Sequence, residues 1–147
     1  MFRKLLPIVC AGAALIAAGQ AAAAEHTVQM LNRGPGGTMV FSPAVVQARP
    51  GDTIRFVPTD PGHNAETIAG MIPAGATVQR GAMGREFVLR VTQPGVYAVK
   101  CAPHYSMGMV GLIQVGKAAN KAQATAAANA LPGLGKKKMV ELLAKAK

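Results

Sequence analysis

The segment Lys100–Met109, KCAPHYSMGM, gathers side chains that can bind a metal or act in catalysis. It contains Cys101, then His104 three residues later and Met109 five residues after that. Pro103 restricts the backbone between the cysteine and the histidine, so both are presented from a tight loop rather than from a helix. A thiolate, an imidazole and a thioether on one loop suit a soft transition metal such as copper.

A blue-copper site needs one further nitrogen ligand, because it combines two histidines and one cysteine in a plane with a weak axial methionine. Outside the loop the chain has only His26 and His63. His26 lies at the start of the expected mature chain, where residues are often mobile. His63 follows a Pro-Gly turn in TDPGHNAET, and we predict that it is the distant ligand.

Three other interpretations of these residues remain open. The cysteine and methionine can be ordinary core side chains. Cys101 can also be a nucleophile with His104 as its base, although no orienting residue or oxyanion signature accompanies the pair. The chain can alternatively handle copper as cargo rather than carry electrons, in which case exposed and exchangeable methionine and histidine ligands are expected.

The first 24 residues match a secretory signal peptide. Arg3 and Lys4 precede an apolar run over residues 5–18, and the alanines at 22–24 predict cleavage before Glu25. The apolar run is shorter than the roughly 20 residues that a membrane-spanning helix needs. We therefore predict a periplasmic protein with no membrane span after cleavage.

Cleavage leaves a single cysteine, because it removes Cys10 and retains Cys101. A lone thiol in an oxidising compartment is prone to oxidation or to intermolecular pairing. A bound metal would protect this thiol, so export strengthens the prediction of a metal site.

The chain is strongly basic. Without Arg3 and Lys4, its 16 basic residues become 14 against 6 acidic residues, a formal charge of +8. Such an excess indicates an anionic partner. Export and the scarcity of aromatic side chains disfavour nucleic acid, so we predict an acidic protein face as the partner.

Residues 25–116 are predicted to form an antiparallel β-sandwich or barrel. Short apolar segments alternate with Pro-Gly turns at the spacing typical of such folds, namely HTVQMLN, DTIRFVPT, EFVLRV, GVYAVK and MVGLIQV. Residues 117–147 are predicted to add two helices, KAANKAQATAAANA and KKKMVELLAKAK, interrupted by LPGLG and packed on one face of the sandwich. We expect residues 25–147 to form one domain, with Lys136–Lys138 on a solvated helix face.

Two long segments and the helical tail resemble pseudoazurins, which are type 1 copper proteins of the cupredoxin family. The segments are PGDTIRFVPTDPGHNAETI and TQPGVYAVKCAPHYSMGMVGLIQV. The resemblance covers residues 25–147 and implies an all-β, eight-stranded Greek-key sandwich that holds one copper ion. It also implies a periplasmic electron carrier, not an enzyme, that cycles between Cu(I) and Cu(II); we expect a monomer.

The resemblance also assigns individual residues. It implies that His63, Cys101, His104 and Met109 are the copper ligands, and that the backbone amide of Asn64 hydrogen-bonds the cysteine sulfur. The remaining residues carried over from the family lie around the exposed histidine: Met39 near its ring, and Lys100 and Arg33 in a ring of basic residues. Pro61 stands where the family often has a further lysine.

We expect the ring edge of His104 to emerge through an apolar patch of Met39, Pro103 and Met107. Lys100 and Arg33 would steer an acidic redox partner onto this patch, which mainly raises the association rate. The resemblance implies copper nitrite reductase or a cytochrome as that partner.

Overall fold

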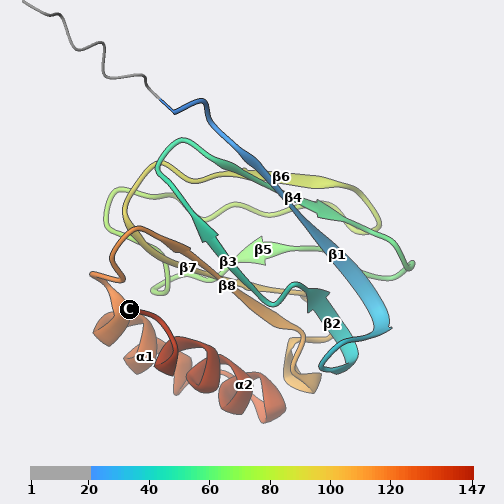
Figure 1. Ribbon diagram of the computed structural model, residues 1–147. Coiled ribbons are helices and arrows are strands. Elements are labelled where there is room, and N and C mark those ends of the chain that lie inside the picture. Colours follow the sequence, from blue (N-terminus) through green and yellow to red (C-terminus); the bar gives the residue numbers. More distant parts are fainter. Residues whose placement is uncertain (1–20) are drawn as a thin grey trace, which may run out of the picture.

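The computed structural model describes residues 21–147 (Figure 1). The signal peptide predicted for residues 1–24, with Cys10, lies outside the described residues except for its last four positions. Within residues 21–147, no helix has both the length and the apolar character needed to cross a bilayer.

Eight strands form two sheets of four that face each other (Figure 1). The first sheet has the order β2-β1-β4-β6 and consists of β1 (Glu25–Gly34), β2 (Gly37–Ser42), β4 (Thr53–Val57) and β6 (Phe87–Arg90). The second has the order β3-β8-β7-β5 and consists of β3 (Val45–Ala48), β5 (Glu66–Thr67), β7 (Gly95–Lys100) and β8 (Val110–Val115). The predicted eight-stranded sandwich is therefore confirmed.

The sheets are mixed, whereas the sequence predicted antiparallel pairing. β1 pairs with β4 in parallel, and β3 pairs with β8 in parallel. The chain passes through β2 in the same sheet and β3 in the other sheet before β4 lies beside β1 in the same direction. The other pairs are antiparallel, and β7–β8 brings Lys100 opposite Val110 at the end of the sheet where the cysteine loop begins.

The space between the sheets is filled by large apolar side chains that alternate with exposed ones along the strands. In β4, Ile54 and Phe56 are fully buried while their neighbours are partly exposed. The ring of Phe56 meets that of Phe41 edge to face, with centroids 5.6 Å apart. Cys101 and Met109 belong to this same core.

Two helices cover the outer face of the second sheet, as predicted (Figure 1). They are α1 (Lys121–Ala128) and α2 (Gly133–Ala144), and Met139 and Leu143 of α2 pack in one core with side chains of β7 and β8. Both strands are consequently buried on two faces, which explains why VYAVK and VGLIQV are apolar almost throughout. α2 begins at Gly133, inside the LPGLG segment that was expected to interrupt the helices, and the residue before it, Pro132, is extended.

Asp52 fastens the start of β1 to the sheet. Its buried carboxylate accepts hydrogen bonds from the Arg49 amide at 2.9 Å, the His26 ring at 2.9 Å and the Ala24 amide at 2.8 Å. These donors, the Arg49 amide first, lower the pKa of Asp52 to about 2. A carboxylate so held stabilises the fold only while it is ionised.

Gln114 fastens the C-terminal end to β8. Its buried side chain donates to the carbonyls of Gly116 and Lys147, both at 2.8 Å, and accepts from the Lys147 amide at 3.2 Å. A polar residue on a strand buried on both faces is thereby fully hydrogen-bonded.

Candidate metal centre

The four predicted ligands lie at one end of the sandwich, on segments far apart in the sequence. His63 lies in the connection between β4 and β5, and Cys101 follows β7 directly. His104 precedes the short 3-10 helix η1 (Tyr105–Met107), and Met109 precedes β8. The fold therefore places the distant histidine beside the cysteine loop.

Three of these side chains point their donor atoms at a common centre. The Sγ atom of Cys101 lies 3.5 Å from Nδ1 of His104 and 3.8 Å from Nδ1 of His63, and the two Nδ1 atoms are 3.1 Å apart. All three atoms lie within 4.8 Å of one another. A metal bonded to nitrogen at about 2.0–2.1 Å and to sulfur at about 2.3 Å, the lengths seen in zinc sites, holds trigonal donors about 3.5–3.8 Å apart. The two sulfur–nitrogen separations fit one metal ion, and the nitrogen–nitrogen separation of 3.1 Å is slightly shorter than that range.

Met109 is held directly against the cysteine by the backbone. The Cys101 amide donates to the Met109 carbonyl at 3.1 Å, and the Met109 amide donates to the His104 carbonyl at 3.2 Å. The methionine side chain is completely buried in the same core as Cys101. A thioether is thus fixed within the loop that carries the thiolate and one imidazole.

A sequence profile of copper-binding proteins of the plastocyanin/azurin family matches residues 28–116. The chain belongs to this family. It is 52% identical over 116 residues to pseudoazurin of Methylorubrum extorquens, covering 79% of this chain and 78% of that protein. It is also 52% identical over 112 residues to pseudoazurin of Paracoccus pantotrophus, covering 76% and 77%.

Solved structures agree with this family membership. Pseudoazurin from Methylobacterium extorquens AM1 superposes with a TM-score of 0.75 at 48% identity, covering 82% of this chain and 98% of that structure. Native pseudoazurin from Hyphomicrobium denitrificans superposes with a TM-score of 0.76 at 43% identity, covering 84% and 98%. The predicted resemblance to pseudoazurins is confirmed, and the cofactor of this cupredoxin is copper.

The fully buried His63 ring of this cupredoxin is oriented by a residue that the sequence did not reveal. Its Nε2 lies 2.8 Å from the side-chain oxygen of Asn32. Because an amide oxygen only accepts, Nε2 carries the proton and Nδ1 keeps its lone pair towards Cys101 and His104. Burial, and then the nearby His104 ring, lower the pKa of His63, which favours the neutral imidazole that binds metals.

Asn64 links the two ligand segments. Its side-chain oxygen accepts from the Ala102 amide at 2.8 Å, and its backbone amide hydrogen-bonds Cys101. Burial raises the pKa of the Cys101 thiol, while the backbone hydrogen bonds from Asn64 and His104 oppose that rise. A metal bound here would keep the sulfur as a thiolate, whose charge these two amides would stabilise.

Lys100, which we predicted for the docking surface, is partly exposed and also makes contacts within the protein. Its Nζ lies 3.5 Å from a carboxylate oxygen of buried Glu66 and 4.5 Å from the centre of the Tyr105 ring, and its side chain is only 24% exposed. The other Glu66 oxygen binds Arg80 at 2.8 Å, and Asn64 donates to it at 3.3 Å. Glu66, which the sequence did not predict as a site residue, therefore links Lys100 to Asn64 beside the metal centre.

The other predicted surface residues are accessible. Pro103, Met107 and Arg33 are exposed, while His104 and Met39 are half-buried. Met39 adopts φ 51°, in the left-handed region, and its side chain packs against the sandwich core. Arg33 lies opposite Thr38 on the β1–β2 hairpin and forms no salt bridge within residues 21–147.

Proposed function

We propose that this cupredoxin is a single-electron carrier in which His63, Cys101 and His104 bind copper in a plane and Met109 is the weak axial ligand. The observation that carries the proposal is the convergence of three donor atoms within 4.8 Å, with a fourth donor buried in the same loop. Bound copper supplies a one-electron Cu(I)/Cu(II) couple. Four ligands from the protein leave no coordination position for a substrate, so the chain is not an enzyme.

The surrounding residues keep the ligands in place in both redox states. Asn32 holds the proton on His63, and Asn64 fastens the segment that carries this ligand to the cysteine loop. Because the ligands are held by a packed core and by hydrogen bonds, their positions change little when the copper gains or loses one electron. His104 is the one ligand that reaches the surface, which makes it the exit for the electron.

The partner is an acidic redox protein, either copper nitrite reductase or a cytochrome. Met39, Pro103 and Met107 form the apolar contact around His104. Arg33 and Lys100 supply positive charge beside it. The chain acts in the periplasm as a monomer, with one domain over residues 25–147 after cleavage before Glu25. The signal-peptide pattern, the basic charge and the similarity to pseudoazurins support this part of the proposal.

Copper loading of residues 25–147 tests the function. We expect intense visible thiolate-to-copper absorption, its loss in Cys101→Ala, and a reversible one-electron couple by voltammetry. A wild-type protein that stays colourless, with metal analysis showing that zinc does not block the site, refutes the proposal. A protein that binds copper exchangeably without a reversible couple is instead a copper-handling protein.

A further inference from the structure

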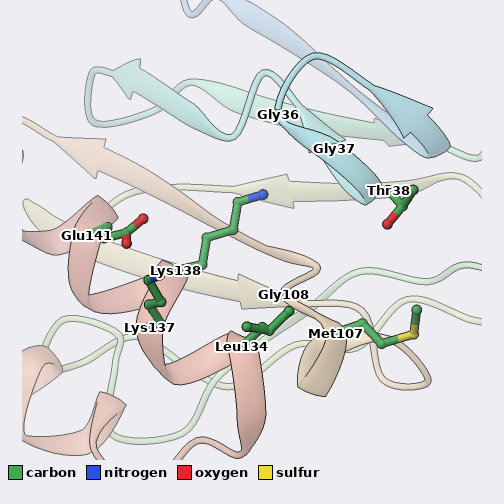
Figure 2. Close-up of a pocket in the computed structure, with 9 residues that line it drawn as sticks. All are labelled: Gly36, Gly37, Thr38, Met107, Gly108, Leu134, Lys137, Lys138 and Glu141. Carbon is green, nitrogen blue, oxygen red and sulfur yellow. The ribbon is translucent and has the colours of Figure 1, made fainter.

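A groove runs between the tip of the β1–β2 hairpin and the first turns of α2 (Figure 2). Its volume is about 330 Å³. The hairpin contributes Gly36, Gly37 and Thr38, the ligand loop contributes Met107 and Gly108, and α2 contributes Leu134, Lys137, Lys138 and Glu141. Three separate parts of the chain thus border one concave surface beside the copper loop.

The groove has an apolar side. Met107 is 48% exposed and Leu134 is 59% exposed, although both are large apolar side chains. Within residues 21–147 only four large apolar side chains are at least 48% exposed, and two of them border this groove. Exposed apolar groups gathered beside polar ones are typical of surfaces that meet another protein.

The groove also has a basic side that the fold itself does not use. Lys137 and Lys138 form no salt bridge within the described residues, and the Lys138 side chain extends from α2 towards the hairpin tip (Figure 2). Its Nζ lies 3.9 Å from the position that a Cβ atom on Gly36 would occupy. The first turn of α2 contains no acidic residue, and lysines near a helix N-terminus oppose the helix dipole. Stabilisation of α2 therefore does not explain why Lys137 and Lys138 lie near the start of this helix.

The groove is connected to the copper site by short backbone contacts. The Met107 amide donates to the His104 carbonyl at 3.0 Å, and the Gly108 amide donates to the Tyr105 carbonyl at 3.1 Å. A protein segment seated in the groove consequently lies against the loop that holds the exposed histidine. Arg33, opposite Thr38 on the hairpin, adds a third basic residue that forms no salt bridge in the part of the chain that the structure describes.

We propose that the groove is a second docking element for the electron-transfer partner and receives a segment that combines a carboxylate with an apolar side chain. The carboxylate binds between Lys137 and Lys138, and the apolar group packs on Met107 and Leu134. The sequence predicted Lys136–Lys138 as a solvated face; the groove gives two of these lysines a partner-binding role instead. This inference rests on the proposed electron-carrier function.

The test compares two double variants that remove the same charge. Lys137→Gln with Lys138→Gln empties the basic side of the groove. Lys117→Gln with Lys145→Gln removes two exposed lysines, one just after β8 and one at the opposite end of α2. Electron transfer from the reduced copper protein to a purified copper nitrite reductase is followed by stopped flow at low and high salt, with hexacyanoferrate(III) as a small acceptor.

The groove variant is expected to lower the low-salt rate to nitrite reductase about 3- to 10-fold and to weaken its salt dependence, while the distant variant changes the rate less than about 2-fold. Leu134→Ser should lower the same rate without altering the rate to hexacyanoferrate(III). Equal effects of the two double variants, or wild-type rates in both, would refute the proposal that the partner docks in the groove. A wild-type protein that reduces neither acceptor refutes the electron-carrier function itself.

Discussion

Gly135, in the first turn of α2, offers a direct test of how the helical tail supports the copper loop. A Cβ atom on this buried glycine would lie 2.2 Å from the Tyr105 carbonyl oxygen and 3.2 Å from its carbonyl carbon. Alanine fits the backbone conformation of a helix, so only this contact excludes it. We predict that Gly135→Ala forces α2 and η1 apart.

The size of the effect follows from the overlap. Carbon and carbonyl oxygen ordinarily approach to about 3.3 Å, so the backbone must move by roughly 1 Å. Overpacking of this kind costs about 1–3 kcal/mol, and the upper end applies because a carbonyl oxygen has no rotamer by which to move away. Alanine recovers about 1 kcal/mol of helix propensity, which leaves a loss of about 2 kcal/mol in the free energy of unfolding.

Denaturant unfolding of the copper-free and copper-loaded proteins measures this loss. Lys136→Ala, at the next and exposed position, serves as the control and should change the free energy of unfolding by less than about 0.5 kcal/mol. Because Tyr105 follows His104 directly, Gly135→Ala should also shift the visible absorption and the reduction potential. A Gly135→Ala protein with wild-type stability and an unchanged spectrum would refute the argument.

Three further substitutions test single contacts. Asn32→Ala releases the His63 ring and should weaken copper binding about 10- to 100-fold in chelator competition, so unchanged affinity would count against the orienting hydrogen bond. Asp52→Asn should flatten the pH dependence of unfolding of the copper-free protein. The Arg49 amide and the His26 ring, which remain after cleavage before Glu25, lower the pKa of Asp52, so its carboxylate stabilises the fold above the ordinary pKa of 3.8 and this contribution is lost as the pH falls below that value. An equally steep acid dependence in the variant would contradict this. Gln114→Leu leaves the Lys147 amide without its acceptor, while the Lys147 carbonyl keeps the hydrogen bond from the Ala118 amide, and should cost about 1 kcal/mol by thermal unfolding. A neutral result would mean that Gln114 does not hold Lys147.

The sequence predicted much of the metal centre because its residues are few and close together. Cys101, His104 and Met109 share one loop, and only three histidines remain after the first 24 residues, which made His63 the natural fourth candidate. Five strands were visible as apolar segments between Pro-Gly turns. β2, β3 and β5 were not separately predicted, since β5 has only two residues and β3 four.

What the sequence did not predict depends on contacts between distant segments. Asn32 meets His63 across 31 positions, and no local pattern distinguishes this asparagine from any other surface residue. The Glu66 carboxylate and its pairing with Lys100 depend on the register of β5 and β7. The start of α2 at Gly133 likewise depends on close packing against η1, which propensity alone does not reveal.

The contact between η1 and α2 also makes metal binding and helix docking reciprocal. Tyr105 lies between His104 and Met109 in the chain, and its carbonyl contacts Gly135. A metal that fixes this loop also fixes the surface on which α2 packs. By thermodynamic linkage, docking of α2 increases metal affinity, and metal binding stabilises the docked α2 by the same free energy. This stabilisation should appear as slower hydrogen exchange of the backbone amides of α2 when the metal is bound. A tail that contributes no ligand is in this sense part of the binding site.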